Sequence, residues 1–377
     1  MRSTLIWLAL TVLILLGVGL LFVGSASAPK CIKEGVSTLF YVKKQGLAMS
    51  LGLFLAVCLA FFDYHKWKQW PLLHWFSFGV LCVLLGAVFL NEASHGARRW
   101  ISLGIFQFQP SETAKFLGII LTAVAIDKIG WKLNLFWKGL FPLLAGISLV
   151  GGLILLEPDY GGGLIFLALT MLLLWVGGAR IRYVLGLVLV AGSVIALLIM
   201  TNPNRVRRLK ESFKEDGYGY QVNNSIVAIR NGGWQGRGYY ESCQKWEYLP
   251  ESHTDYIFAI GAEEGGMVFS MGVLGLYLLF FVLGLRIAYY APDRLGRLIA
   301  YGMTFLVSAQ AVANVAVVSG WGFSKGLALP FLSYGGTNVM VALMAVGMIF
   351  SVGLRIELPR GRIRGKIKKS ISFKGGR

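Results

Sequence analysis

The chain begins with an uncharged stretch, LIWLALTVLILLGVGLLFV (Leu5 to Val23), whose 19 residues are almost entirely apolar. A membrane-spanning helix needs about 20 such residues. Similar runs recur along the chain, which is 56% hydrophobic and only 14% charged. A soluble protein of 377 residues would carry many more charges. The sequence therefore predicts an all-α, polytopic membrane protein.

Ten ranges are apolar and long enough to span a membrane, and together they predict a single membrane domain over residues 1–377. The first is followed by GSASA (24–28), which is typical of a signal-peptide cleavage site. We interpret it as an uncleaved span, because its apolar run exceeds the usual length of about 7–15 residues. A turn at EPDYGGG separates the fifth range from the sixth. The ranges are 5–24, 46–62, 71–90, 112–127, 137–156, 161–179, 183–200, 257–285, 296–318 and 335–354.

The distribution of positive charge predicts the orientation of these spans. An even number of spans leaves both termini on one side, and the short loops of that side are rich in Lys and Arg. The tail, residues 355–377, has nine Lys or Arg against one Glu. The positive-inside rule then places both termini in the cytoplasm. The connection 201–256 becomes a long external loop, with eight Lys or Arg against seven Asp or Glu.

The formal net charge of +18 could also indicate a nucleic-acid-binding protein. However, the chain lacks basic motifs interleaved with aromatic residues, which single-stranded nucleic acids need for base stacking. A basic cluster directly after a span is typical of a segment that contacts anionic membrane lipids. We therefore expect membrane lipids, and no nucleic acid, as partners of the tail.

The external loop ends in LPESHTDYIF (Leu249 to Phe258), which places a carboxylate at the mouth of the eighth span. Asp255 has two interpretations: part of a helix cap with Thr254 as the capping residue, or a general base. Glu263 and Glu264 follow within the span. Adjacent acids in an apolar helix are costly unless they face a wet cavity or a partner.

A second polar cluster, HGARRWISLGIFQFQPSETAK, runs from His95 to Lys115. Arg98 is either an interfacial anchor or part of a clamp for phosphate. Ser111 is expected to cap the following helix. Lys115 lies one turn into the membrane, where it needs an anion: Glu112 or the phosphate of a ligand.

Further candidates for substrate binding lie near the same external rim. The ALPFLSYGGTN segment (328–338) predicts a tight turn containing Ser333, whose backbone amides could bind an anion, although loop packing is the alternative. Lys245 and His253 belong to the external loop. The basic run of this loop either forms a solvated surface or binds phosphate; it consists of Arg205, Arg207 and Arg208.

The sequence decides neither whether a metal ion is bound nor whether a disulfide forms. The four histidines are scattered, and no set of metal ligands can be identified, so the metal is unknown and a divalent cation stays an open alternative. Cys31 and Cys243 both fall on the external side, and a disulfide between them is likewise open.

Four motifs give the chain a resemblance to the SEDS family of cell-wall polymerases. They are GARRWISLGIFQFQPSETAKF, EPDYGGG, QKWEYLPESHTDYIFAIGAEEGG and GLALPFLSYGGTN, in the order and spacing of the family. SAS after the first span and QKWEYLP before the HTD segment resemble FtsW, the division member. Three segments depart from the family pattern: GAEEGG, GRGYYESCQK and PDYGG.

The resemblance implies an enzyme that polymerises lipid II outside the cytoplasmic (inner) membrane, at the division septum. Asp255 corresponds to the family's catalytic aspartate, and Glu247 to a further important acid. Asp255 would deprotonate the acceptor sugar's 4-hydroxyl, and undecaprenyl pyrophosphate would leave. We nominate as its cationic ligands Arg98, Lys115 and one of Arg205, Arg207 or Arg208. The implied partners are a class B penicillin-binding protein, which is a transpeptidase, and other division proteins.

Two other functions suit a ten-span protein. A flippase for the lipid-linked precursor would need ionisable residues along a path near mid-membrane, whereas here they gather at the external rim. A non-enzymatic scaffold that recruits the transpeptidase would need only its helix faces and basic tail. In a scaffold, Asp255 would be dispensable.

Overall fold

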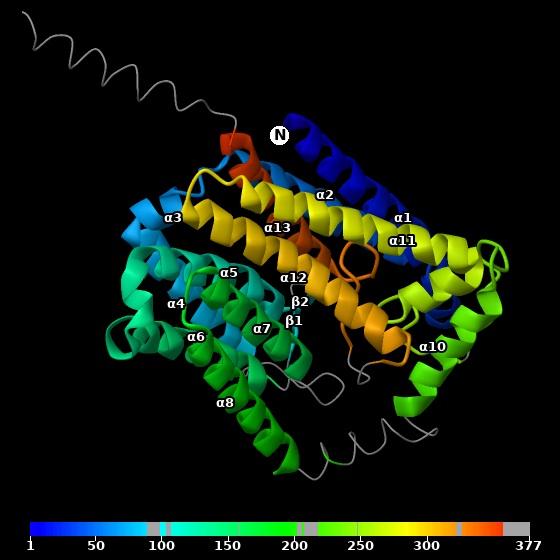
Figure 1. The fold of residues 1–377 in the computed structure, drawn as a ribbon. Coiled ribbons are helices and arrows are strands. Elements are labelled where there is room, and N and C mark those ends of the chain that lie inside the picture. The colour runs from blue at the N-terminus through cyan, green and yellow to red at the C-terminus, as the bar shows by residue number, and fades with distance from the viewer. Residues whose placement is uncertain are drawn as a thin grey trace, which may run out of the picture.

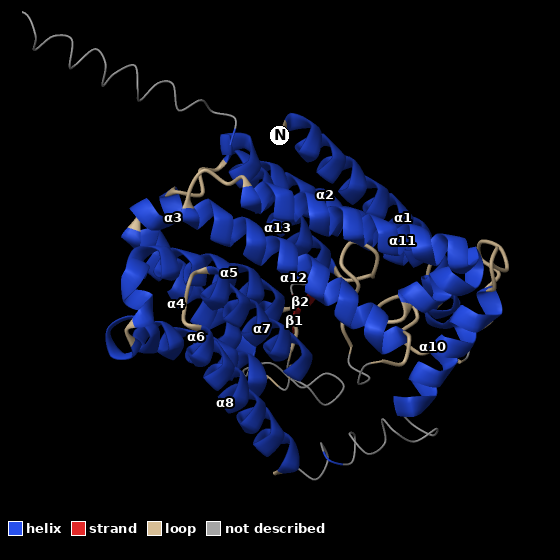
Figure 2. Cartoon of the chain, viewed as in Figure 1, coloured by secondary structure: helices blue, strands red, loops and turns tan. Residues whose placement is uncertain are grey.

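The computed structural model describes residues 1–88, 99–102, 107–157, 159–201, 206, 218–246, 248–321 and 326–356. These residues are mostly helical (Figure 2). Two short strands, β1 (Ile101–Ser102) and β2 (Gln107–Phe108), pair antiparallel. The helical elements are α1 (Arg2–Glu34), α2 (Phe40–Phe61), α3 (Lys66–Gln69), α4 (Pro71–Ala87), α5 (Pro110–Ile129), the 3-10 turn η2 (Gly130–Asn134), the π-turn η3 (Phe136–Leu140), α6 (Phe141–Leu156), α7 (Tyr160–Val176), α8 (Ile181–Met200), α10 (Tyr218–Gly232), α11 (Ile257–Tyr289), α12 (Arg294–Val318) and α13 (Gly336–Ile356).

Each of the ten predicted ranges overlaps one of these helices. Six helical segments of the described residues are long and apolar enough to cross a membrane: Arg2–Glu34, Phe40–Phe61, Phe136–Leu156, Ile257–Tyr289, Arg294–Val318 and Gly336–Ile356. Shorter apolar helices cover Pro71–Ala87, Tyr160–Val176 and Ile181–Val194. The predicted all-α, multi-span membrane fold is confirmed.

Two features of the helices were not predicted. α1 continues to Glu34, so the GSASA segment lies inside a helix, with Ser25 and Ala28 buried against the bundle. The loop 201–256 contains α10, which has no long apolar run and therefore does not resemble a span.

The helices form two groups that share α5 (Figure 1). The long helices α1, α2, α11, α12 and α13 pack side by side, while α4, α6 and α7 pack against α5, α7 also contacts α12, and α8 packs on α7. α8 lies at the periphery, and most of its described side chains are exposed. The structure thus combines a tightly packed group with a more open one.

Small residues allow α2 and α13 to approach closely. A Cβ atom at Gly347 would lie only 2.4 Å from the backbone oxygen of Ala56, and one at Gly52 would lie 3.0 Å from the Cα atom of Met340. Membrane helices use such small residues because van der Waals packing, rather than water exclusion, holds them together.

A polar cluster, here named the polar clasp, joins the ends of three helices. It consists of Asp63, Tyr64, His65, Asp293 and Arg355. The two ring nitrogens of His65 lie 2.7 Å from Asp63 Oδ1 and 2.9 Å from Asp293 Oδ2. The Tyr64 hydroxyl donates to Asp293 (2.5 Å), and Arg355 pairs with Asp63 (3.3 Å). The clasp therefore fixes the end of α2, the start of α12 and the end of α13 to one another.

The four cysteines are all free thiols, with Cys31 buried and Cys243 exposed. The disulfide left open by the sequence is therefore not formed in this structure.

Candidate functional site

The segment that carries Asp255 lies at the end of the bundle opposite the polar clasp, where α11 begins. Three consecutive backbone oxygens are held there from outside the segment. His253 O accepts from Tyr334 N (2.9 Å), Thr254 O from Ser333 Oγ (2.5 Å) and Asp255 O from Asn314 Nδ2 (2.7 Å). The backbone of Asp255 is thus fixed by α12 and by the turn before α13.

The helix-cap interpretation of Asp255 is wrong. The residue before α11 is Tyr256, and no side chain caps this helix. Thr254 instead donates to the backbone oxygen of Glu251 (3.1 Å). Neither Thr254 nor Asp255 therefore performs this structural role. The general-base interpretation stays a prediction.

The Asp255 carboxyl group is half-buried and lies against Gly326, where a Cβ atom would come within 2.6 Å of Oδ2. In the described part of the chain, its carboxylate oxygens accept no hydrogen bond. Burial, aided by the charge of Glu251 and opposed by Arg99, raises the pKa of Asp255 to about 7. A carboxylate with such a pKa is a competent proton acceptor near neutral pH.

His253 lies in an aromatic enclosure beside this segment. Its ring centroid is 5.3 Å from that of Tyr41 and 5.6 Å from that of Tyr334, and its Nε2 is 3.4 Å from Lys30 Nζ. Burial and the Lys30 charge lower the pKa of His253 to about 4, so the imidazole is neutral at pH 7. His253 is buried and supports the segment; its contact with substrate stays a prediction.

The turn that contains Ser333 supports the same segment. Ser333 Oγ donates to Thr254 O and accepts from Leu329 N (2.7 Å), while Gln45 Nε2 donates to Ser333 O (3.0 Å). Loop packing, the alternative that the sequence left open, is therefore the role that these contacts give to Ser333.

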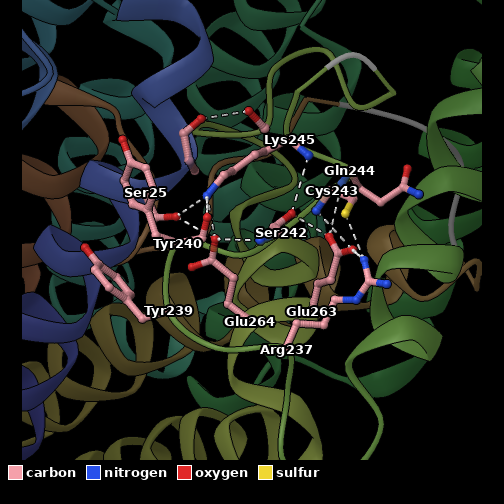
Figure 3. A network of polar contacts seen from close by, with 12 residues as sticks. Ser25, Arg237, Tyr239, Tyr240, Ser242, Cys243, Gln244, Lys245, Glu263 and Glu264 are labelled. Carbon is pink, nitrogen blue, oxygen red and sulfur yellow. Dashed lines mark hydrogen bonds and ion pairs between the residues drawn. The ribbon is translucent and has the colours of Figure 1, made fainter.

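A buried network connects the loop 201–256 to α11 and α1 (Figure 3). Lys245 Nζ donates to Ser25 Oγ (2.8 Å), Tyr240 O (2.6 Å) and Glu264 Oε1 (2.9 Å). The Lys245 and Glu264 side chains are both 0% exposed. All three ammonium hydrogens of Lys245 have protein acceptors, so this residue holds the loop to the helices. Its predicted contact with substrate stays a prediction.

Glu263 is held by the same loop. Its carboxylate accepts from Ser242 Oγ (2.5 Å), Gln244 N (3.2 Å) and Arg237 Nη1 (3.4 Å). The sequence left two alternatives for these adjacent acids, a wet cavity or a partner. In the structure, Glu263 and Glu264 both have protein partners.

The glycines of the loop allow it to approach a kink in α11. Gly266 has φ 68° and ψ −163°, which interrupts the helical hydrogen bonds. Arg237 N and Gly238 N each donate across 3.0 Å, to Glu263 O and Glu264 O respectively. A Cβ atom at Gly236 would lie 2.1 Å from Glu264 O, so only glycine allows this contact.

A second ion pair lies deeper in the bundle. Lys115 Nζ donates to Glu112 Oε1 (2.7 Å), and Gln310 Nε2 donates to Glu112 Oε2 (3.0 Å). Gln310 lies four residues before Asn314 on α12, so the pair is about one helical turn, or 6 Å, below the Asp255 contact. Glu112 is thus the partner of Lys115 in this structure.

The EPDYGGG turn lies next to the start of α5. Asp159 caps α7 by accepting from Gly162 N (2.9 Å), and it also accepts from Ser111 Oγ (2.9 Å). The expected cap by Ser111 is therefore wrong: Gln109 precedes α5, and Ser111 contacts Asp159 instead.

Glu157 in this turn is 0% exposed, and neither of its carboxylate oxygens has a hydrogen-bond partner among the described residues. Burial and Asp159 raise the pKa of Glu157 to about 8, against the opposing charge of Arg99. Arg99 thus acts electrostatically on both Glu157 and Asp255.

Several predicted residues lie outside the described residues: Arg98, Arg205, Arg207, Arg208 and Glu247. Among the described residues, no group of three or more His, Cys, Asp or Glu could hold a metal ion. Asn314 and Gln310 were not among the predicted site residues. Their signal was present, since polar residues four apart in a span mark one face of a helix that meets polar partners.

The fold and this site define a class of protein: a multi-span membrane protein with a partly desolvated carboxylate at the mouth of one span. The chain belongs to the FtsW/RodA/SpoVE family, described as cell cycle proteins, whose sequence model matches residues 5–356.

Similar proteins include curated relatives and solved structures. A probable peptidoglycan glycosyltransferase FtsW from Geobacter sp. (strain M18) is 34% identical over 343 residues, 90% of this chain and 94% of that protein. Stage V sporulation protein E from Bacillus subtilis is 34% identical over 349 residues, covering 92% and 95%. These relatives confirm the SEDS family, and the first supports the expected similarity to FtsW.

Among solved structures, one chain of a peptidoglycan synthase complex that coordinates polymerization and crosslinking matches with a TM-score of 0.75 at 28% identity, covering 93% of this chain and 98% of that chain. The rod shape determining protein RodA of Thermus thermophilus matches with a TM-score of 0.68 at 27% identity, covering 93% and 97%.

Proposed function

We propose that the protein is a peptidoglycan glycosyltransferase that polymerises lipid II into glycan strands at the outer face of the cytoplasmic membrane, with Asp255 as general base. The observation that carries this proposal is the state of Asp255. Its backbone is fixed, the pKa of its carboxyl group is near 7, and no described group binds the carboxylate oxygens. The glycosyltransferase names of the relatives give the reaction class.

In the proposed reaction, Asp255 takes the proton of the acceptor's 4-hydroxyl group. That oxygen attacks C1 of the donor sugar, the bond from C1 to the pyrophosphate oxygen breaks, and undecaprenyl pyrophosphate leaves with inversion. General-base assistance supplies a factor of about 10²–10⁴. Positioning and electrostatic stabilisation must supply the rest.

The leaving pyrophosphate needs positive charge. We assign this role to Arg98, to Lys115 and to one of Arg205, Arg207 or Arg208, with a divalent cation as a further contributor. Lys115 is bound to Glu112 across 2.7 Å, so it would have to exchange this carboxylate for a phosphate oxygen. Such an exchange of one anion for another avoids leaving a buried ammonium unpaired.

The proposal includes an orientation and partners. Both termini, with the basic tail, lie in the cytoplasm, and the Asp255 end of the bundle faces outward. A class B penicillin-binding protein cross-links the product, as the synthase complex among the structural neighbours suggests. The similarity to FtsW proteins favours the division septum, with other division proteins as partners.

The test is glycan-strand synthesis from purified lipid II with the cognate transpeptidase present. Asp255→Asn should abolish polymer formation while binding the transpeptidase normally. The matched control is Glu241→Gln, an exposed acid in the same loop, which should retain activity. Polymer from Asp255→Asn would refute the general-base role. If the wild type forms no polymer, the flippase or the scaffold is favoured. An assay of lipid II translocation in vesicles would then distinguish these two functions.

A further inference from the structure

A groove on the open side of the bundle lies between α4, α5 and α6, far from Asp255. It encloses about 240 Å³ and ends against Phe166 of α7. Its walls are apolar except for His74 and Thr122. Two of its lining residues, Trp75 and Pro142, are exposed, so the groove opens toward the surrounding lipid.

The length of the groove matches one leaflet of a bilayer. Its lining on α5 extends from Gly118 to Ile129, which are 11 residues apart. This separation corresponds to about 16 Å along a helix, and the whole hydrocarbon core is about 30 Å thick. The Ile129 end lies beside Asp127, which pairs with Lys68 near the polar clasp (2.6 Å). The groove therefore lies in the leaflet that faces away from Asp255.

The segment that joins α5 to α6, next to the Ile129 end of the groove, is basic. Lys128 follows the paired Asp127 and lies within electrostatic reach of His74. Lys132 in η2 and Lys138 in η3 are also exposed, next to Trp131 and Trp137 with exposed fractions of 73% and 74%. Exposed tryptophan and lysine are typical of the headgroup region of a membrane.

We infer that this groove binds one acyl chain of an anionic phospholipid, whose headgroup lies on Lys128, Lys132 and Lys138. The apolar walls accept the chain, and the lysines beside the Ile129 end select a negative headgroup. His74 Nδ1, which has no hydrogen-bond partner among the described residues, lies in the groove wall near this end. The site is separate from the proposed glycosyl transfer and does not depend on it.

Two glycines of α6 provide a matched pair of variants. A Cβ atom at Gly146, which lines the groove, meets nothing within 4 Å, and the same holds for Gly152, which does not line it. Gly146→Leu should therefore fill the groove without a backbone clash, and Gly152→Leu adds the same side chain elsewhere on α6.

The experiment measures the lipid retained by the purified full-length protein, by native mass spectrometry, after exchange into phosphatidylglycerol or phosphatidylcholine of identical acyl chains. We expect the wild type and Gly152→Leu to retain phosphatidylglycerol preferentially and Gly146→Leu to lose it. Lys128→Gln and Lys132→Gln, both on exposed side chains, should each weaken phosphatidylglycerol binding about five-fold.

Three results would overturn the inference: equal retention of the two lipids by the wild type, equal loss from both glycine variants, or unchanged binding in both lysine variants. Thermal unfolding of each variant in detergent checks that the fold is intact. If Gly146→Leu unfolds, the lysine variants alone decide whether an anionic headgroup is bound at this end of the groove.

Discussion

The backbone of Asp255 is fixed and its carboxyl group is poorly solvated. The protonation state of this carboxyl group should govern the rate of strand synthesis. A general base must be ionised to act. Because the pKa of Asp255 is about 7, the rate of strand synthesis should rise about tenfold per pH unit below that value and level off above it. Initial rates measured across this pH range test the prediction, and a rate that is flat through pH 7 would contradict it.

The neighbouring acid Glu251 offers a way to move this profile. Its charge contributes to the raised pKa of Asp255, so Glu251→Gln should shift the midpoint of the profile to lower pH. Because Glu251 is exposed, solvent screens the effect and the shift should be modest. Glu241→Gln is the control and should leave the midpoint in place.

The raised pKa also has a consequence for stability. The folded protein binds the Asp255 proton more tightly than the unfolded chain, so stability falls as pH rises from about 4 to about 7. Asp255→Asn should therefore unfold at the same or a higher temperature than the wild type at pH 8, although we expect it to be inactive. Thermal unfolding in detergent tests this, and a strongly lowered transition would assign Asp255 a structural role.

The pair of Lys245 and Glu264 shows how burial changes the value of an ion pair. Lys245→Met leaves the Glu264 carboxylate buried and unpaired, which should cost about 3–5 kcal/mol. The double variant with Glu264→Gln should recover much of this loss. The control is Lys68→Met in the pair with Asp127, where the Lys68 side chain is 45% exposed and the cost should stay below about 1 kcal/mol. Equal destabilisation of the two single variants would refute the argument.

Among the helices, α12 positions the backbone of Asp255. Asn314 Nδ2 donates to Asp255 O and Leu327 O (2.7 and 2.5 Å). Asn314→Ala removes both bonds, and a misplacement of about 1 Å can lower kcat about 100-fold. Ser308→Ala is the control on α12, because the Ser308 hydroxyl has no partner among the described residues. An unchanged kcat in Asn314→Ala would show that the turn before α13 suffices.

Two glycines of α11 should respond in opposite ways to substitution, because Gly266 forms the kink and Gly272 does not. Gly266→Ala would place a Cβ atom 2.3 Å from Gly236 N in a backbone conformation that L-residues avoid, and should cost at least about 1–3 kcal/mol. At Gly272 the same change meets nothing within 4 Å and should stabilise the helix by up to about 1 kcal/mol. Unfolding transitions that move in the same direction would contradict this account.

The helices could be predicted from the sequence, whereas many of the contacts between them could not. The spans were predictable because lipid requires about 20 apolar residues per helix, which is a local signal. The partners of Glu264 and Asp255 were not, since Ser25 is separated from Glu264 by 239 positions and Asn314 from Asp255 by 59. Such contacts depend on how the helices pack. α10 was missed for another reason, because it lies in a polar segment without an apolar run.

For the molecule as a whole, the proposed orientation predicts which thiol faces the outside. Cys243 is exposed near the Asp255 end. A membrane-impermeant maleimide added to intact cells stripped of outer barriers should label the wild type, and Cys243→Ser should remove the signal. An added Lys132→Cys thiol at the opposite face should react only after permeabilisation. The reverse pattern would invert the orientation.

The polar clasp has a mechanical consequence. It pins the start of α12 to α2 and α13, so any tilt of α12 must pivot there. The 25 residues of α12 form a lever about 37 Å long, and a tilt of only about 5° would move its far end by about 3 Å. That displacement is as long as the Asn314 hydrogen bond to Asp255 O. A small disturbance at the pinned end could thus disengage the proposed base at the opposite membrane face.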